Sequence, residues 1–362
     1  MTESPHSCQT SLARRITAIE PFHVMEIQEQ AHRLELAGRS IIHMEIGQPD
    51  FGAPPQVLRA AAEAIHGRPL GYTSALGITE LRQALSAFYE QKFGVVVPWQ
   101  RIIITAGASG ALLLTLGALV NAGDEVLMSD PCYPCNRHFV RLFDGTPVSI
   151  PADARQNYQL TLDDVKRHWT PKTRGVLVAS PSNPTGTVIP QNELSAIASW
   201  VSRHNGFLIV DEIYQNLVYE IAAETSLSLS PDIYVINSFS KYFGMTGWRL
   251  GWVVAPEQSV RDIEKLAQNV FICPSVCPSA PAQYAALAAF SAEALSILED
   301  RRLELQRRRD FLLPALRLLG FSLPLQPQGA FYLYAGCEQL GLDGSALARH
   351  LLDEAGVAIT RA

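Results

Sequence analysis

The sequence is poor in lysine and carries no excess of positive charge. Only five of its 29 lysine and arginine residues are lysines, at positions 92, 166, 172, 241 and 265. The formal net charge is −6, which argues against the strongly basic surface of a nucleic-acid-binding protein. Residues 1–20 are polar, hold paired arginines and lack an apolar core, so we expect no secretory signal.

Cysteine is scarce for the length of the chain. Six cysteines in 362 residues are too few for a disulfide framework, so we expect reduced thiols and a cytoplasmic protein. Cys132 and Cys135 have the CxxC spacing of a redox or zinc half-site. No second pair and no clustered histidines accompany them, and we therefore expect no metal site.

One long run without charge could be mistaken for a membrane span. Residues 102–123 contain no charged side chain and would be flagged in a hydropathy scan. Small residues interrupt this run at positions 105–110 (TAGASG), which indicates a turn between a buried strand and a buried helix. We therefore expect no membrane partner.

From about residue 100 the chain alternates between apolar, strand-like runs and helical patterns. Continuous apolar strands separated by helices are typical of a mostly parallel sheet that is covered on both faces. The sequence thus predicts an α/β fold with a seven-stranded sheet flanked by helices, whose last strand is a candidate for antiparallel pairing. The predicted strands are 102–105, 125–128, 147–150, 175–179, 207–210, 233–236 and 250–255.

The two ends of the chain do not continue the alternation of strands and helices. A chain of this length exceeds one small core, so one large and one small domain are expected. Residues 46–279 are predicted to form the large, cofactor-binding domain, and residues 1–45 together with 280–362 a small α+β domain. Within the latter we expect a long helix over 283–319, and strands over 329–334 and 357–360.

Chemically useful groups follow five of the predicted strands. Ligands of open parallel sheets bind at the carboxyl ends of the strands. The groups are a glycine-rich helix start at 106–110 that could hold a phosphate, a tyrosine, an amide, a carboxylate and a lysine; the last four are Tyr133, Asn183, Asp211 and Lys241. Alone, Lys241 fits a surface turn as well as a desolvated nucleophile. Together the five suit pyridoxal 5′-phosphate, a phosphorylated aromatic aldehyde.

Three motifs carry a resemblance to a known family. They are Asn183-Pro-Thr-Gly186, Asp211-Glu-Ile-Tyr214, and Ser238-Phe-Ser-Lys241 extended to Arg249. In this order and spacing the chain resembles the class I/II aminotransferases, which are fold type I pyridoxal-phosphate enzymes, over nearly all of residues 12–360. The fold expected from the resemblance agrees with the one expected from the strand pattern.

The resemblance implies roles for individual residues. Lys241 would form the Schiff base with the cofactor, Asp211 would pair with its ring nitrogen, and Tyr214 with Asn183 would hold its phenolic oxygen. Gly47 and Asn183 would meet the substrate. Tyr72 would reach the phosphate of a neighbouring subunit, which implies a homodimer with shared active sites. The remaining cofactor-binding residues would be Tyr133, stacked on the ring, and Ala108, Ser109, Ser238, Ser240 and Arg249 at the phosphate.

The cofactor-binding residues leave the reaction open. Amino transfer from an α-amino acid to a 2-oxo acid is the leading function, and a carbon–sulfur β-lyase is an alternative. Family members usually continue beyond a strand like 357–360 and carry there an arginine for the substrate carboxylate. This sequence stops at Ala362, and Arg361 does not match that context. A cofactor-binding but catalytically impaired, truncated homologue is thus a further alternative.

Overall fold

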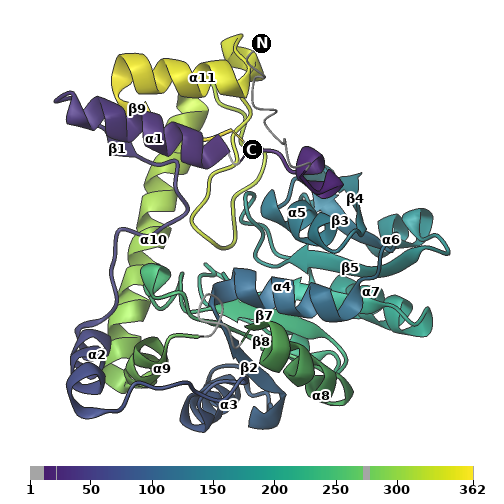
Figure 1. Ribbon diagram of the computed structural model, residues 1–362. Helices are drawn as coiled ribbons and strands as arrows, with labels where there is room; N and C mark the ends of the chain where they lie inside the picture. The colour runs from purple at the N-terminus through teal and green to yellow at the C-terminus, as the bar shows by residue number, and fades with distance from the viewer. Residues whose placement is uncertain (1–11, 22, 272–277, 362) are drawn as a thin grey trace, which may run out of the picture.

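A seven-stranded sheet forms the centre of the protein (Figure 1). The computed structural model describes residues 12–21, 23–271 and 278–361. The sheet has the order β2-β8-β7-β6-β5-β3-β4, in which β8 is antiparallel to both of its neighbours and the other pairs are parallel. The predicted sheet is therefore confirmed. The strands are β2 Ile102–Thr105, β3 Glu125–Asp130, β4 Thr146–Pro151, β5 Thr173–Ala179, β6 Phe207–Asp211, β7 Tyr234–Ser238 and β8 Gly251–Val254.

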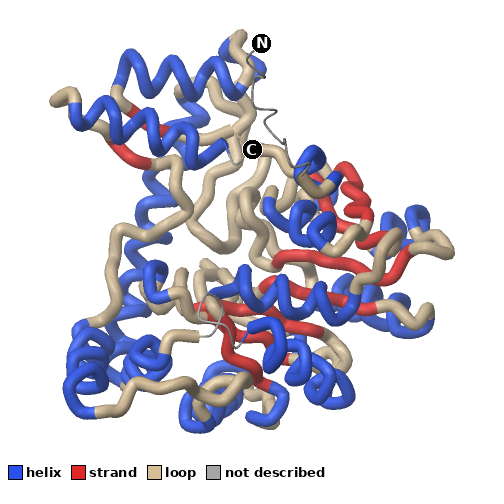
Figure 2. The backbone as a smooth tube through the Cα atoms, in the orientation of Figure 1, coloured by secondary structure: helices blue, strands red, loops and turns tan. Residues whose placement is uncertain are grey.

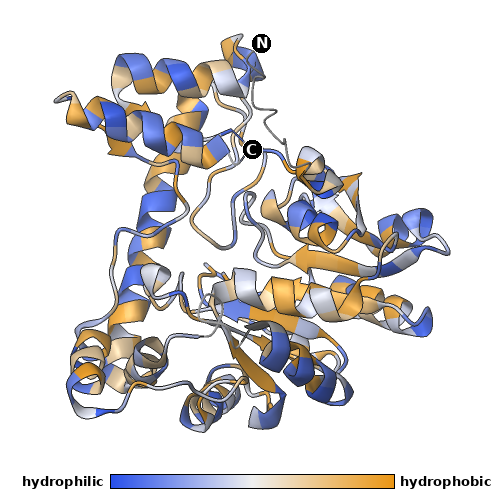
Figure 3. Cartoon of the chain, in the orientation of Figure 1, coloured by the Kyte–Doolittle hydropathy of each residue, from blue (hydrophilic) through white to orange (hydrophobic). Residues whose placement is uncertain are grey.

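Helices cover both faces of this sheet. Successive side chains of a strand point to opposite faces, so in β7 Tyr234 and Ile236 pack into one core and Val235 into the other. The strands and α4 are accordingly apolar along most of their length (Figure 3). The core of Tyr234 and Ile236 includes α4 Gly107–Leu119, α5 Cys135–Leu142 and α8 Glu257–Leu266; that of Val235 includes α3 Thr79–Phe93, α6 Leu162–His168 and α7 Gln191–Arg203.

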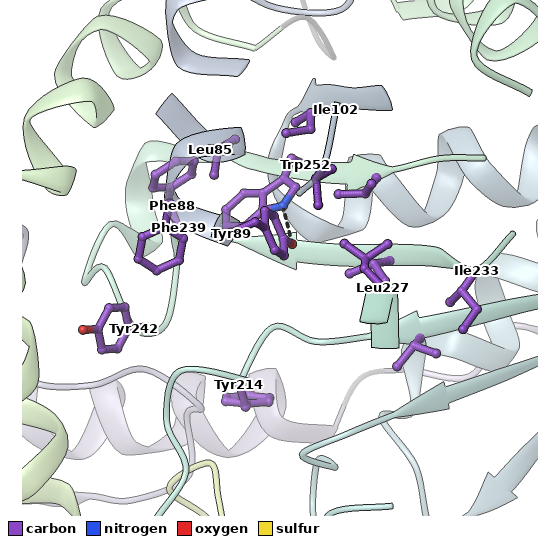
Figure 4. Close-up of a cluster of buried hydrophobic side chains, with 14 of the residues drawn as sticks. Leu85, Phe88, Tyr89, Ile102, Tyr214, Leu227, Ile233, Phe239, Tyr242 and Trp252 are labelled. Atoms are coloured by element: carbon purple, nitrogen blue, oxygen red, sulfur yellow. Dashed lines mark hydrogen bonds between the residues drawn. The ribbon is translucent and has the colours of Figure 1, made fainter. Parts of the chain in front are cut away.

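An aromatic cluster fixes the chain just after β7 (Figure 4). Phe239 is fully buried, and the centroid of its ring lies 5.0 Å from the ring centroid of Trp252 and 4.9 Å from that of Phe243. The indole N–H of Trp252 donates to the hydroxyl of Tyr89 (3.1 Å). Aromatic pairs of this kind add about 0.5–1.5 kcal/mol each beyond the burial of their area. The cluster thereby anchors the segment that carries the candidate lysine two residues further on.

A second substructure joins both ends of the chain (Figure 2). Strands β1 Ile42–His43 and β9 Val357–Ala358 pair in parallel. They lie beside α1 His23–Leu36 and α11 Gly344–His350 (Figure 1). The long helix α10, Ala292–Leu318, runs from this region to α2 Pro55–Gly67 and α9 Ala280–Ala286. The division into a 46–279 domain and a domain from both ends stays a prediction.

Two expected elements of the C-terminal region are wrong in detail. The helix over 283–319 is interrupted by a 3-10 turn, Leu287–Phe290, and α10 starts afresh because the Ser291 hydroxyl accepts from the N–H of Ala294 (3.3 Å). Residues 329–334 form no strand, because Ala330 has a positive φ of 58° and the backbone N–H of Gly329 bonds to a loop carbonyl, that of Gly186. Among the described helices none is both long and apolar enough to cross a membrane.

Candidate active site

A cavity of about 330 Å³ opens at the carboxyl ends of the parallel strands. The segments after β5, β6 and β7 and the start of α4 contribute to its wall. Tyr72 lies outside it and is 77% exposed, so its expected contact across subunits stays a prediction. The other residues predicted for the site all line the cavity: Gly47, Ala108, Ser109, Tyr133, Asn183, Asp211, Tyr214, Ser238, Ser240, Lys241 and Arg249.

Lys241 lies three residues beyond the end of β7. Because Phe239 is held in the aromatic core, Ser238, Ser240 and Lys241 are left to form the wall of the cavity. The Nζ atom of Lys241 donates a hydrogen bond to the carbonyl oxygen of Gly47. Burial, reinforced by the positive charge of Arg249, lowers the pKa of Lys241 to about 8. A large fraction of the amine is therefore neutral near pH 8 and able to act as a nucleophile or a base.

Asp211 is the last residue of β6 and is only 6% exposed. Burial raises the pKa of its carboxyl group to about 6, although the N–H of Ile213 and the charge of Lys241 favour the ionised form. The hydrogen bond from Ile213 measures 3.0 Å. A buried carboxylate beside a cavity is stabilised by a cationic donor in that cavity, so Asp211 can select a ligand with a protonated nitrogen.

An anion-binding corner faces the start of α4. Gly107 has a φ of +74°, and a Cβ at this position would lie 2.6 Å from a guanidinium nitrogen of Arg249. No described side chain caps the start of α4, and the N–H groups of a first helical turn have no partner within the helix, so they can bind an anion. The hydroxyl of Ser238 lies 2.9 Å from that of Ser240 and accepts from its N–H (3.0 Å). A helix start, an arginine and two hydroxyls together suit a phosphate group.

Three polar side chains of the cavity wall meet one another. The hydroxyls of Tyr214 and Tyr332 are 2.6 Å apart, and the amide Nδ2 of Asn183 donates to Tyr332 (3.3 Å). Burial raises the pKa of Tyr332 to about 12 and holds that of Tyr214 well above its ordinary value. All three hydroxyl and amide groups are therefore neutral at physiological pH, so this corner offers neutral hydrogen bonds.

The comparison with known proteins gives the family. A family model described as aminotransferase class I and II matches residues 39–362. The chain belongs to this family. It is 41% identical to the valine–pyruvate aminotransferase of Mycobacterium tuberculosis, over 94% of this chain and 87% of that protein.

Solved structures of aminotransferases share the whole architecture. A crystal structure of an aminotransferase from M. tuberculosis matches with a TM-score of 0.92 and 39% identity, covering 97% of this chain and 89% of that one. The aspartate aminotransferase of Thermus thermophilus with maleate matches with a TM-score of 0.90 and 31% identity, covering 97% and 91%. The predicted fold type is thus confirmed, and the chain is an aminotransferase by family.

Tyr332 was missed in the sequence of this aminotransferase. It falls in the run 329–334, whose apolar and aromatic residues suggest an ordinary strand. The Gly329-Ala-Phe-Tyr stretch ends in no recognisable polar motif. The hydroxyl of Tyr332 contacts that of Tyr214, which lies 118 residues earlier in the sequence. A tyrosine three residues after a glycine, behind a loop with two prolines, was the available signal, and it is a weak one.

The two cysteines of the CxxC pair form no disulfide in the structure. Cys132 and Cys135 are both free, and burial raises the pKa of Cys132 to about 11 and also raises that of Cys135. Their thiols are therefore protonated and poor nucleophiles near neutral pH. Among the described residues no group of three or more histidine, cysteine or acidic side chains could hold a metal ion.

Proposed function

We propose that this aminotransferase uses pyridoxal 5′-phosphate, bound through Lys241, to move an amino group from an α-amino acid to a 2-oxo acid. The observation that carries the proposal is the pairing of a lysine of lowered pKa with a buried carboxylate in one cavity. A neutral amino acid with pyruvate is the first pair to test, because the relative of 41% identity is named for valine and pyruvate.

The residues present fit the cofactor. Asp211 is a buried carboxylate that a pyridinium N–H would stabilise, and the lack of a side chain at Gly107 lets the guanidinium group of Arg249 lie against the start of α4, where a phosphate would be bound. Asn183 and Tyr214 offer neutral hydrogen bonds for the phenolic oxygen. The ring of Tyr133 and the serines complete the set, as do Ala108 and Ser109 at the helix start.

The chain's own groups then have distinct tasks. When bound, the cofactor supplies a carbonyl carbon that condenses with amines and a ring that withdraws electrons. Asp211 holds a proton on the ring nitrogen. The amine of Lys241 would take up the proton that leaves the substrate's α carbon, because its lowered pKa keeps much of the amine neutral. Gly47, whose carbonyl accepts from Lys241, orients the substrate.

The functional unit that we propose is a homodimer of the cytoplasm. An apolar depression of about 890 Å³ adjoins the active-site cavity and shares Thr246 and Arg249 with it. Phe51, Leu58 and Trp248 line this depression. We place a second copy there because the family resemblance implies that its Tyr72, which is exposed, contacts the phosphate in a shared active site.

Replacing the lysine tests the function directly. Lys241→Ala removes the amine, so we expect the loss of both the visible-range absorbance of bound cofactor and the formation of 2-oxo acid from an amino donor. Lys265→Ala is the matched control, since Lys265 is an exposed residue of α8 paired with Asp262. Normal turnover in the Lys241→Ala protein would refute the assignment.

A further inference from the structure

A second carboxylate in the cavity wall has no role in the scheme above. Glu45 lines the active-site cavity together with Gly47, and its side chain is 0% exposed. One oxygen, Oε1, bonds to Nδ1 of His43 at 2.9 Å. The other, Oε2, is buried and has no hydrogen-bond partner among the described residues.

Glu45 shares its histidine partner with a second acidic side chain, that of Glu35. His43 lies between two carboxylates, with its Nε2 atom 3.1 Å from Glu35. The carboxylates of Glu45 and Glu35 accept hydrogen bonds from the protonated ring of His43, which raises the pKa of His43. Even a fully protonated His43 therefore faces two acidic groups, and it neutralises only one of them.

The cations of the cavity do not serve the free oxygen either. Lys241 donates to the carbonyl of Gly47, and Arg249 donates to the carbonyl of Thr246 (3.0 Å). Arg361, the third cation of the cavity wall, donates to the hydroxyl of Ser345 (2.9 Å) and bonds to the ring of His23. A buried polar oxygen without a partner is costly, and more so when it carries charge. A donor that enters the cavity would remove this cost, so the site is built to favour a ligand that brings one.

We propose that Glu45 reads the side chain of the amino-acid substrate. It accepts a hydrogen bond from a side-chain hydroxyl or ammonium group, and it repels a side chain that ends in a carboxylate. The inference rests on the proposed function, since the ligand concerned is the amino donor. It assigns the preferred substrates to neutral or basic amino acids whose side chains carry a donor.

Isosteric pairs of amino donors isolate this interaction. Threonine and valine differ by a hydroxyl in place of a methyl group, and ornithine and norleucine by an ammonium in place of a methyl group. For the loaded enzyme we expect kcat/KM to favour the donor-bearing member of at least one pair by roughly 10- to 100-fold. Glu45→Ala should abolish this preference, and Glu45→Gln should raise the glutamate-to-glutamine ratio, because the amide does not repel a carboxylate.

Equilibrium binding gives a readout that does not depend on turnover. 2-Methylserine and isovaline have no hydrogen on the α carbon and therefore cannot be transaminated. They differ only by a hydroxyl in place of a methyl group, and the change in cofactor absorbance measures the binding of each. Glu35→Ala is the matched control: it removes the other partner of His43 but lies outside the cavity wall. It should leave every ratio unchanged.

The outcomes separate this inference from the function on which it rests. If the wild-type protein transaminates no amino acid, the proposed function fails, whatever Glu45 does. If the wild type is active but shows no preference for the donor-bearing members, or if Glu45→Ala and Glu45→Gln leave the ratios unchanged, the role of Glu45 is overturned. Glu45→Gln keeps the size of the side chain, so it answers the question if Glu45→Ala does not fold.

Discussion

The active-site lysine should destabilise the cofactor-free protein. Its pKa of about 8, against an ordinary 10.5, reports how much the cavity disfavours the charged amine. Lys241→Met keeps the length and apolar stem of the side chain and removes the charge. We therefore expect the free energy of unfolding of the Lys241→Met protein at pH 7 to exceed that of the wild type, while its aminotransferase activity is lost. Functional groups in active sites commonly lower the stability of the fold in this way.

The expected gain follows from the difference between the two pKa values. At about 1.4 kcal/mol per pKa unit, the shift of Lys241 corresponds to roughly 3 kcal/mol. The variant also loses the hydrogen bond that Nζ donates to Gly47, which offsets about 1 kcal/mol. The net gain should be about 2 kcal/mol at pH 7, and urea unfolding followed by circular dichroism measures it.

The pH dependence of the gain identifies its cause. The pKa of Lys241 is lower in the folded than in the unfolded chain, so the folded state binds fewer protons between pH 8 and 10.5. The penalty from the lysine is thus full below pH 8, declines as the pH rises through this window and vanishes above 10.5. The advantage of Lys241→Met should fade over the same window.

A control and a clear refutation accompany this prediction. Lys265→Met changes an exposed lysine, and surface changes of this kind stay within about 0.5 kcal/mol. The reasoning is refuted if Lys241→Met lowers the urea midpoint of the cofactor-free protein at pH 7. It is equally refuted if the gain persists unchanged above pH 10.5.

Two further substitutions test the walls of the site. The Cβ introduced by Gly47→Ala would overlap the hydroxyl of Tyr332 and push this hydroxyl away from Tyr214. In steady-state assays we expect kcat/KM to fall about 10- to 100-fold. Adding Tyr332→Phe removes the overlapping hydroxyl and should restore part of the lost kcat/KM. Glu212, next to Asp211, is 2% exposed and accepts hydrogen bonds from the N–H and hydroxyl of Ser226 at 2.6 and 2.7 Å. Glu212→Ala should cost about 2–4 kcal/mol in urea unfolding, and Glu212→Gln less; equal midpoints for wild type and Glu212→Ala would contradict this.

The central sheet was predictable because its signal is local. Each strand is an apolar run bounded by turn residues, and a run such as Ile102–Thr105 needs no knowledge of its neighbours to be recognised. The same local reading fails where the backbone bonds of a segment are decided elsewhere. Residues 329–334 have strand-like side chains, but the N–H groups of Gly329 and Ala330 bond to Gly186 and Leu217 in separate loops.

The position of most predicted site residues also followed from the chain order. Parallel strands end at one edge of a sheet, so groups that directly follow β5, β6 and β7 must lie near one another. This places Asn183, Asp211 and Lys241 in a single cavity wall. Their individual roles toward the cofactor and substrate stay predictions that the substitutions above can test.

Only the folded chain decided what surrounds those groups. The hydroxyl of Tyr332 meets Tyr214 and Asn183 across 118 and 149 positions, and the carbonyl of Gly47 meets Lys241 across 194. Tertiary packing likewise leaves Oε2 of Glu45 without a hydrogen-bond partner among the described residues. It also buries Lys241, and this burial lowers the pKa of the amine. A sequence determines which side chains are available and in what order. How much water and which partners reach each of them is set when distant segments pack, because burial and hydrogen bonding are properties of the space around an atom.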